Sequence, residues 1–304
     1  MIFIVAVLWA LAIGHTATSE SATAQQRSDS VSIVMIGTGT PVPNPHAAGP
    51  ATAVVVGKRV FLFDAGANVE RQLAAADLPT DGVEAVFFTH LHSDHVLGYP
   101  DLIFTSWVFG RRLPLRAFGP PGLKAMTTNL IAAFADDIKV RTTGLEHAIP
   151  NGYRVNVRET RGGVVYDSGG VRITAFPVPH TVWPVALGYR VDALGRSVVI
   201  SGDTRPSEEL TRQSAGVDAL VHEVYSAANV EQEKMPGGGD WPKYLKSAHT
   251  SDVEIASIAK TANPRMVILT HVVSLGATDS AMIAAVRSKG YAGSVVVAHD
   301  LDRY

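Results

Sequence analysis

Residues 89–95 carry three histidines and one aspartate, and they directly follow an apolar run that predicts a buried strand. A loop at the end of a strand can project its side chains into a cleft. His90 and His92 lie two residues apart and can face one metal ion, while Asp94 and His95 can turn toward a second. Imidazole nitrogens and carboxylate oxygens suit zinc. The segment therefore predicts a metal site rather than a solvated, histidine-rich loop.

The chain of 304 residues contains eleven histidines and no cysteine. Disulfides, thiolate metal sites and thiol nucleophiles are thereby excluded, so any metal must be held by imidazole and carboxylate groups. Lys and Arg number 26 against 28 Asp and Glu, which gives a formal net charge of -2. This balance gives no reason to expect a broad nucleic-acid-binding surface, although a local basic patch is compatible with it.

The first residues of the chain resemble a targeting segment. Residues 2–13 are almost entirely apolar, a run too short for a comfortable membrane span. Small and polar residues follow, with Ala22-Thr23-Ala24 as a candidate signal-peptidase site. We therefore expect a signal peptide over 1–24, a mature hydrolase domain over 25–304 that is periplasmic or secreted, and no membrane span after cleavage. Because no Lys or Arg precedes the apolar run, an uncleaved anchor or a wrongly assigned start is the alternative.

The rest of the chain alternates strands with helices and contains no linker. Apolar, β-branched runs predict strands at 31–36, 53–56, 60–64, 85–89, 115–119, 153–158, 164–167, 171–177, 186–191, 196–201, 219–223, 266–271 and 294–298. Helical patterns occupy 68–76, 97–108, 122–134, 208–213, 252–262 and 280–289, and the middle segment 138–178 is predicted as mostly strands. Strands in both halves with helices between them indicate an α/β layered fold with two central sheets.

Three further candidates for metal ligands each follow or end an apolar strand: His180, Asp203 and His271. The ends of strands are where an α/β fold places its chemistry. Any one of these residues alone would more often be a cap or a core residue. Three of them at the same topological position favour a role as ligands.

This order of residues resembles the metallo-β-lactamase superfamily, and further motifs resemble its ribonuclease Z and arylsulfatase-like branch. The motifs are GTGTP at 37–41, FDAG at 63–66, SGDTRP at 201–206, HE at 222–223, AHT at 248–250 and LTH at 269–271. The resemblance covers about residues 31–300. It implies an αββα four-layer sandwich with a dinuclear metal cleft.

The resemblance also implies two zinc ions, with manganese or iron(II) as alternatives. One ion would be held by His90, His92 and His180, the other by Asp94, His95 and His271, and Asp203 would bridge them. Asp64 would be a buried residue that orients a ligand. A hydroxide shared by the two ions would be the nucleophile, and Asp94 would additionally accept a proton from the attacking water.

His249 and Glu223 are, with Asp94, the candidate catalytic residues. By resemblance, His249 lies near the leaving group and donates a proton, while Glu223 holds its imidazole in one tautomer. The alternative for His249 is a residue at the start of a helix, where Ser251 has the character of an N-cap. His222 is expected to face away from the pocket, because neighbours on a strand point to opposite sides.

Three aromatic residues are candidates for lining the substrate site. Trp183 follows His180 by three residues, and Trp241 and Tyr244 lie in the long segment 226–247, which contains three consecutive glycines. Such a segment could be a mobile lid with aromatic contacts. Simple packing is an equally good interpretation for each aromatic residue.

The substrate prediction depends on a departure from the family pattern. The tRNA-processing members of the family commonly carry a basic arm between the motifs that stand here at 188–190 and 201–203, where only about ten residues intervene. Together with the near-neutral charge and the predicted export, this argues against tRNA maturation. We therefore expect a zinc-dependent hydrolase of small esters, either phosphodiesters or aryl sulfates. Its partner would be a small-molecule ester and not a nucleic acid, and the resemblance suggests a homodimer.

Three alternatives to this function are left open. The first is a ribonuclease Z-type tRNA 3′ endonuclease. The second is a lactonase or β-lactamase-type hydrolase, because a fold does not fix the ester. The third is a metal-binding protein without catalytic turnover.

Overall fold

The computed structural model describes residues 30–181, 183–232, 234 and 239–304. Within these ranges no helix is long and apolar enough to cross a membrane. The predicted signal peptide lies outside the described residues, so it stays a prediction.

Two mixed sheets form the centre of the molecule. Sheet A has the order β1-β2-β3-β4-β5-β6, and sheet B has the order β13-β12-β11-β10-β9-β8-β7. The strands of sheet A are β1 (Val31–Gly37), β2 (Ala51–Val56), β3 (Arg59–Phe63), β4 (Val83–Phe87), β5 (Leu115–Gly119) and β6 (Val155–Glu159). Those of sheet B are β7 (Gly163–Ser168), β8 (Val171–Val178), β9 (Ala186–Ala193), β10 (Arg196–Ile200), β11 (Ala219–Tyr225), β12 (Met266–Val273) and β13 (Ser294–Val297).

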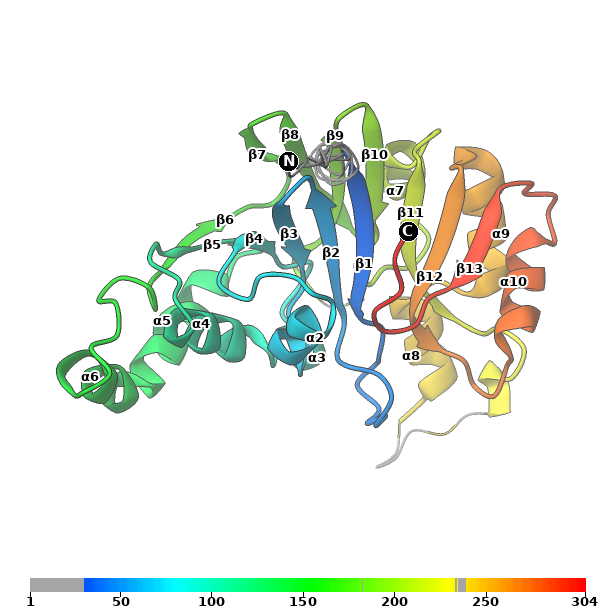
Figure 1. Ribbon diagram of the computed structural model, residues 1–304. Helices are drawn as coiled ribbons and strands as arrows, with labels where there is room; N and C mark the ends of the chain where they lie inside the picture. Colours follow the sequence, from blue (N-terminus) through cyan, green and yellow to red (C-terminus); the bar gives the residue numbers. More distant parts are fainter. Residues whose placement is uncertain (1–29, 182, 233, 235–238) are drawn as a thin grey trace, which may run out of the picture.

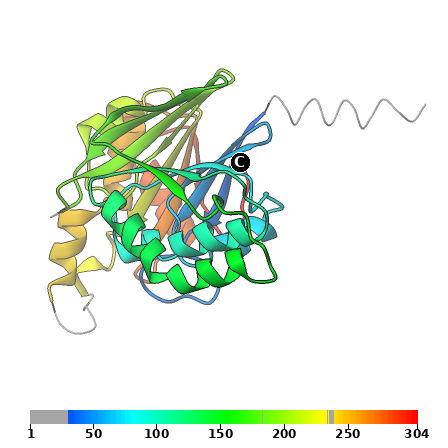
Figure 2. The same ribbon diagram turned by 90° about the vertical axis from the view of Figure 1, so that its left-hand side faces the viewer.

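The helices lie on the two outer faces (Figures 1 and 2). Those beside sheet A are α2 (Val69–Ala75), α3 (Ser93–Val96), α4 (Tyr99–Val108), α5 (Leu123–Ala133) and α6 (Ala135–Thr143). Later in the chain come α7 (Glu208–Gln213), the short η1 (Val230–Gln232), α8 (Trp241–Ala248), α9 (Asp252–Ala262) and α10 (Asp279–Arg287). The order of layers is helix, sheet, sheet, helix, which confirms the predicted αββα sandwich.

Alternation along each strand builds this layering. Ile33 of β1 belongs to the core cluster between the sheets, whereas its neighbour Val34 belongs to the cluster beneath the helices. Successive side chains of a strand point to opposite faces, so a strand covered on both faces is apolar throughout. Between the sheets, Phe87 stacks on Phe118 with ring centroids 5.0 Å apart, and Tyr189 of the facing sheet packs against Phe87 at 5.7 Å.

Strand direction brings the predicted site residues to one edge of the sandwich. β10, β11 and β12 are parallel, and β8 points the same way because it is separated from β10 by the antiparallel β9. Their carboxyl ends therefore meet at one edge. From the opposite sheet, the loop after β4 joins this edge: Leu187 N–H donates to Thr89 O at 2.9 Å, and the Tyr189 hydroxyl donates to Phe88 O at 2.7 Å.

Candidate metal centre

Asp64 fixes the start of the histidine motif. Its carboxylate accepts hydrogen bonds from the backbone N–H and the hydroxyl of Thr89, each at 2.8 Å, and it lies 2.8 Å from Nδ1 of His95. Asp64 is buried and has a φ of 59°. Such a left-handed conformation is strained for a residue other than glycine and is found preferentially at functional sites. Asp64 thus orients two residues of the motif from behind.

The structure brings all seven predicted ligands together. They form two groups, and within each group the candidate ligand atoms lie within 4.8 Å of one another. The first group is His90, His92, His180 and Asp203, and the second is Asp94, His95 and His271.

Asp203 lies between the two groups. Its Oδ1 is 3.4 Å from Nε2 of His95, and its Oδ2 is 3.9 Å from Nε2 of His90 and 3.8 Å from Nε2 of His271. A carboxylate in this position can reach an ion in either group.

Three nitrogens converge in the first group. Nε2 of His90 is 2.9 Å from Nδ1 of His92, which in turn is 3.3 Å from Nε2 of His180. The far nitrogen of His180, Nδ1, donates to the carbonyl oxygen of Ala248 at 2.8 Å. A partner on the far nitrogen fixes the tautomer in which the near nitrogen offers a lone pair, so His180 is prepared to bind a metal ion.

The second group contains an unsatisfied atom. Nε2 of His95 is buried and has no hydrogen-bond partner among the described residues. It lies 3.5 Å from Oδ2 of Asp94, and that oxygen is 3.2 Å from Nε2 of His271. A buried nitrogen without a partner is costly, and a metal ion would satisfy it. The donors of both groups are nitrogen and oxygen only, a set that fits zinc and also accommodates manganese or iron(II).

Burial and the charges within the cluster shift the pKa values of its members in different directions. Burial and the neighbouring His95 hold the pKa of His90 well below its usual range, so His90 stays neutral. Burial opposes ionisation of Asp203, but His271 and His95 outweigh it and hold the Asp203 pKa well below its usual range. Burial lowers the pKa of His95, but the carboxylates of Asp203 and Asp64 outweigh it and raise that pKa well above the usual value, so His95 would release a proton on binding a metal ion.

A β-bulge aims His271 at the centre. The register between β11 and β12 shifts after the pair Glu223–Thr270, so that Val224 is opposite Val272 and His271 is the extra residue. His271 has a φ of 48°. Bulges bend a strand and redirect a side chain next to active sites, which explains how a residue within β12 reaches the cluster.

The predicted catalytic pair lies beside the cluster. Nδ1 of His249 is 3.3 Å from Oε2 of Glu223 and 3.8 Å from Oδ2 of Asp203. The other oxygen of Glu223 accepts from the N–H groups of Thr204 and Thr250, each at 3.1 Å. Burial lowers the pKa of His249, but Glu223 and Asp203 outweigh it and raise that pKa to about 9. Glu223 therefore ties together the segments that carry His249 and Asp203.

The start of the next helix is separate from His249. Ser251 is the N-cap of α9 and forms a capping box with Glu254, as predicted for Ser251, whereas His249 caps the carboxyl end of α8. His222 belongs to neither group, and its Nδ1 donates to the Glu223 carbonyl oxygen at 2.6 Å.

Two contacts of the site were not anticipated from the sequence. The first is the pair of hydrogen bonds from Thr89 to Asp64, for which the only signal in the sequence is a hydroxyl residue directly before His90. The second is the hydrogen bond from His180 to the backbone carbonyl of Ala248, which cannot be predicted from the sequence because every residue has a backbone carbonyl. The indole N–H of Trp183, a predicted wall of the site, donates to Nε2 of His92 at 2.7 Å.

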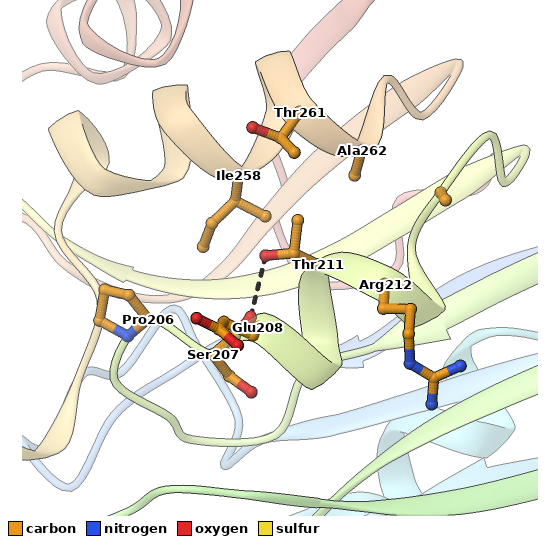
Figure 3. Close-up of a pocket in the computed structure, with 9 residues that line it drawn as sticks. Pro206, Ser207, Glu208, Thr211, Arg212, Ile258, Thr261 and Ala262 are labelled. Carbon is orange, nitrogen blue, oxygen red and sulfur yellow. Dashed lines mark hydrogen bonds between the residues drawn. The ribbon is translucent and has the colours of Figure 1, made fainter.

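Two surface cavities differ in their relation to the cluster. One of about 830 Å³ opens beside Asp94, between residues 40–49 and the start of α2. The other, about 450 Å³, lies between α7 and α9 (Figure 3). In the second cavity the Thr211 hydroxyl donates to Ser207 O at 2.9 Å, and Arg212 is paired with Glu209. Of these two cavities, the first is lined by a residue of the cluster, Asp94, and the second is not.

Comparisons with known proteins identify the family. Residues 59–272 match the model of the beta-lactamase superfamily domain. A ribonuclease Z of Mycobacterium bovis (strain BCG / Pasteur 1173P2) is 34% identical over 261 residues, which cover 84% of this chain and 91% of that protein. A ribonuclease Z of Mycobacterium sp. (strain KMS) is 36% identical over 229 residues, covering 74% of this chain and 78% of that protein.

Solved structures share the fold. The short form of human tRNase Z (ELAC1) superimposes with a TM-score of 0.68 at 21% identity, covering 90% of this chain and 98% of that one. The metallo-beta-lactamase fold protein YhfI from Bacillus subtilis gives a TM-score of 0.69 at 18% identity, with the same coverage.

The predicted substrate class is wrong. We expected a hydrolase of small esters with no nucleic-acid partner, whereas the relatives at 34–36% identity are ribonucleases. Two arguments failed. A net charge is an average over the whole chain and does not report a local binding surface. The short connection between β9 and β10 is also compatible with this group, because a chain that contains it matches one such ribonuclease over 91% of its length.

Fold, motifs and sequence similarity agree, and the chain belongs to the metallo-β-lactamase superfamily of hydrolases, in its ribonuclease Z branch.

Proposed function

We propose that this protein is a ribonuclease Z-type endonuclease that cleaves precursor tRNA at its 3′ end, with two zinc ions held by the clustered ligands. The observation that carries the proposal is the position of His249, which lies within 4 Å of both Asp203 and Glu223 in a chain related to ribonucleases Z. The sequence predicted hydrolysis of phosphodiesters or aryl sulfates, and of these two bonds the phosphodiester is the one found in RNA.

The ligand assignment follows the two groups. His90, His92 and His180 would hold one ion, Asp94, His95 and His271 the other, and Asp203 would contact both. Bound zinc would supply a Lewis acid and lower the pKa of water at the site. Asp94 would accept the proton of the attacking water, since its Oδ2 faces the interior of the second group.

His249 would complete the reaction. Hydrolysis of a phosphodiester breaks a P–O bond, and the departing ribose oxygen needs a proton. Because Nδ1 of His249 faces the carboxylates of Glu223 and Asp203, Nε2 is the nitrogen that remains to donate this proton. Glu223 would hold the ring in that orientation.

The predicted export bears on the physiological RNA and not on the chemistry. Precursor tRNA is made in the cytoplasm, so a chain cleaved after Ala24 and exported would act on other RNA. Sequencing the N-terminus of the protein purified from its cells distinguishes the two cases, since a processed chain begins at Gln25 and an unprocessed one at Met1.

The test of the function is a gel assay of a precursor tRNA transcript with a 3′ trailer, run with zinc-loaded protein. We expect shortening of the transcript, loss of cleavage after chelation and recovery when zinc is returned. The matched control is His249→Ala, which should retain metal and lose most of the cleavage. Zinc-loaded wild-type protein that leaves the transcript intact would refute the proposal.

A further inference from the structure

One face of α8 points at the candidate metal centre. The helix ends at Ala248, whose carbonyl oxygen accepts the hydrogen bond from Nδ1 of His180, and His249 follows directly. Residues three and four apart share a helix face, so Trp241, Tyr244 and Ala248 lie on the same side. Tyr244 is on the side of α8 that approaches the centre, because its ring contacts His249, and Trp241 lies next to it on the same side. Helix α8 lies in the lower part of Figure 1.

The ring of Tyr244 is held on two sides. Its centroid is 5.5 Å from that of His249 in an edge-to-face arrangement at 70°, and 5.5 Å from that of Trp241 in a stack at 14°. Leu245 anchors the helix in a cluster with Tyr225 and Val230. With its ring packed against His249 and Trp241, Tyr244 has its hydroxyl as the polar group that can contact a ligand.

The hydroxyl of Tyr244 has no hydrogen-bond partner in the part of the chain that the structure describes. Burial, with the nearby charges of Asp203, Asp94 and Glu223, raises the Tyr244 pKa to about 12. The Tyr244 ring contacts His249, whose Nδ1 lies 3.8 Å from Oδ2 of Asp203, so Tyr244 borders the centre, and its hydroxyl stays a donor at neutral pH. A phosphodiester offers only acceptors at its unesterified oxygens, and donors placed around them stabilise the charge that develops there.

We propose that Tyr244 contacts the substrate, donating its hydroxyl hydrogen to a phosphoryl oxygen bound at the metal centre, and that Trp241 is a positioning residue that holds the Tyr244 ring. This inference rests on the phosphodiester chemistry proposed above. The Tyr244 hydroxyl would thus be a contact to the reacting phosphoryl group that the protein supplies, in addition to those supplied by the metal ions.

The test compares Tyr244→Phe with wild type in zinc-loaded protein. The substitution keeps the ring and its stacking and removes only the donor. A hydrogen bond to a charged group corresponds to roughly 10- to 100-fold in an equilibrium or rate, so we expect kcat for precursor RNA to fall by about that factor at unchanged zinc content. The matched control is Tyr153→Phe, because Tyr153 also packs against a tryptophan, Trp107, at 5.3 Å but in the opposite helix layer. It should leave kcat unchanged.

A second probe separates this inference from the proposed function. Inorganic phosphate presents the same acceptor oxygens without RNA, and its binding to the zinc-loaded protein can be measured by calorimetry. We expect the Kd for phosphate to rise about 10-fold in Tyr244→Phe. If precursor tRNA is not cleaved but this rise is seen, the contact stands and the RNA assignment falls. Equal phosphate affinity in both proteins, or none in the wild type, would overturn the contact even if RNA is cleaved.

Trp241 provides an independent check of positioning. Trp241→Ala removes the stack and should lower kcat about as much as Tyr244→Phe, whereas Trp241→Phe restores an aromatic face and should recover most of the loss. The double variant Trp241→Ala/Tyr244→Phe should be no worse than Tyr244→Phe alone, because Trp241 acts through the hydroxyl. Additive losses, or no recovery with phenylalanine, would contradict this role.

Discussion

Glu223 and His249 face each other at the edge of the metal cluster, with 3.3 Å between Oε2 of the carboxylate and Nδ1 of the imidazole. The second carboxylate oxygen is occupied by two backbone N–H groups, those of Thr204 and Thr250. A carboxylate held in this way cannot rotate away from the ring, so it fixes the direction in which His249 can donate.

This arrangement predicts how replacing either residue changes kcat. Glu223→Gln keeps an oxygen for the two N–H groups but removes the charge facing His249, so kcat should fall roughly 10- to 100-fold. His249→Ala removes the proton donor and should lower kcat about 10²- to 10⁴-fold, the usual contribution of general acid catalysis. Because the pair acts as a unit, Glu223→Gln/His249→Ala should be no slower than His249→Ala. Independent, multiplying effects in steady-state kinetics would show that Glu223 acts elsewhere.

Asp64 predicts an effect on metal affinity. Its carboxylate supports both Thr89 and His95 without itself belonging to either ligand group. Replacing a residue that orients a ligand typically costs about 10- to 100-fold in metal affinity, and we expect this for Asp64→Asn. Competition with a chelator of known affinity measures it.

The control for Asp64 is Asp218→Asn. Asp218 is partly exposed and accepts hydrogen bonds from Ser197 and Arg196 at the far end of β10. Its replacement should leave zinc affinity unchanged. Similar affinities for all three proteins would mean that Asp64 does not prepare His95.

Glu70 predicts a dependence of stability on pH. It lies buried in the first turn of α2, and neither carboxylate oxygen has a hydrogen-bond partner among the described residues. Burial and the charge of Asp101 raise its pKa from 4.5 to about 8, against the opposing effect of Arg111. The folded state therefore keeps a proton that the unfolded state has lost between about pH 4.5 and 8, so this group makes the free energy of unfolding fall as pH rises through that window.

The variant Glu70→Gln tests this sign. At pH 5 its free energy of unfolding should lie within about 1 kcal/mol of the wild-type value, and at pH 9 it should be higher, by up to a few kcal/mol on the order of the shift. Urea denaturation at both pH values measures the difference. Glu208→Gln, on the exposed surface of α7, is the control and should change stability by less than about 0.5 kcal/mol at either pH. An equal gain for Glu70→Gln at pH 5 and 9 would contradict the proposed ionisation.

The sequence predicted the fold where burial leaves a periodic signal. Helix α9 and the buried strands from β1 to β12 were anticipated because their apolar residues must meet a core. The prediction for helix α6 (Ala135–Thr143) was wrong in part, because residues 138–143 were expected to lie in a segment made mostly of strands. None of its residues is fully buried and Ile138 packs against the core only in part, so its amphipathic pattern is weak, and local pairs such as Arg141 with Asp137 at 2.9 Å contribute to its stability.

The site was predictable to the extent that its residues follow strands. Parallel strands end at a common edge, so ligands far apart in the chain, such as His180 and His271, could be grouped from the amino-acid sequence alone. Helix α8 was missed within the segment 226–247, although Asp240 as N-cap and Pro242 in the first turn are its signals. The substrate could not be read from net charge, because recognition depends on where charges and rings lie and not on their sum.

The most direct measurement of the central claim is the mapping of the cleavage position in a precursor tRNA transcript treated with zinc-loaded protein. Sequencing of the product ends should give one cut, at the junction of the tRNA body and its 3′ trailer. The variant His90→Ala/His92→Ala, which lacks two nitrogens of the first group, should bind less zinc and give no cut. Scattered cleavage along the transcript, or an intact transcript with fully zinc-loaded wild-type protein, would contradict the account.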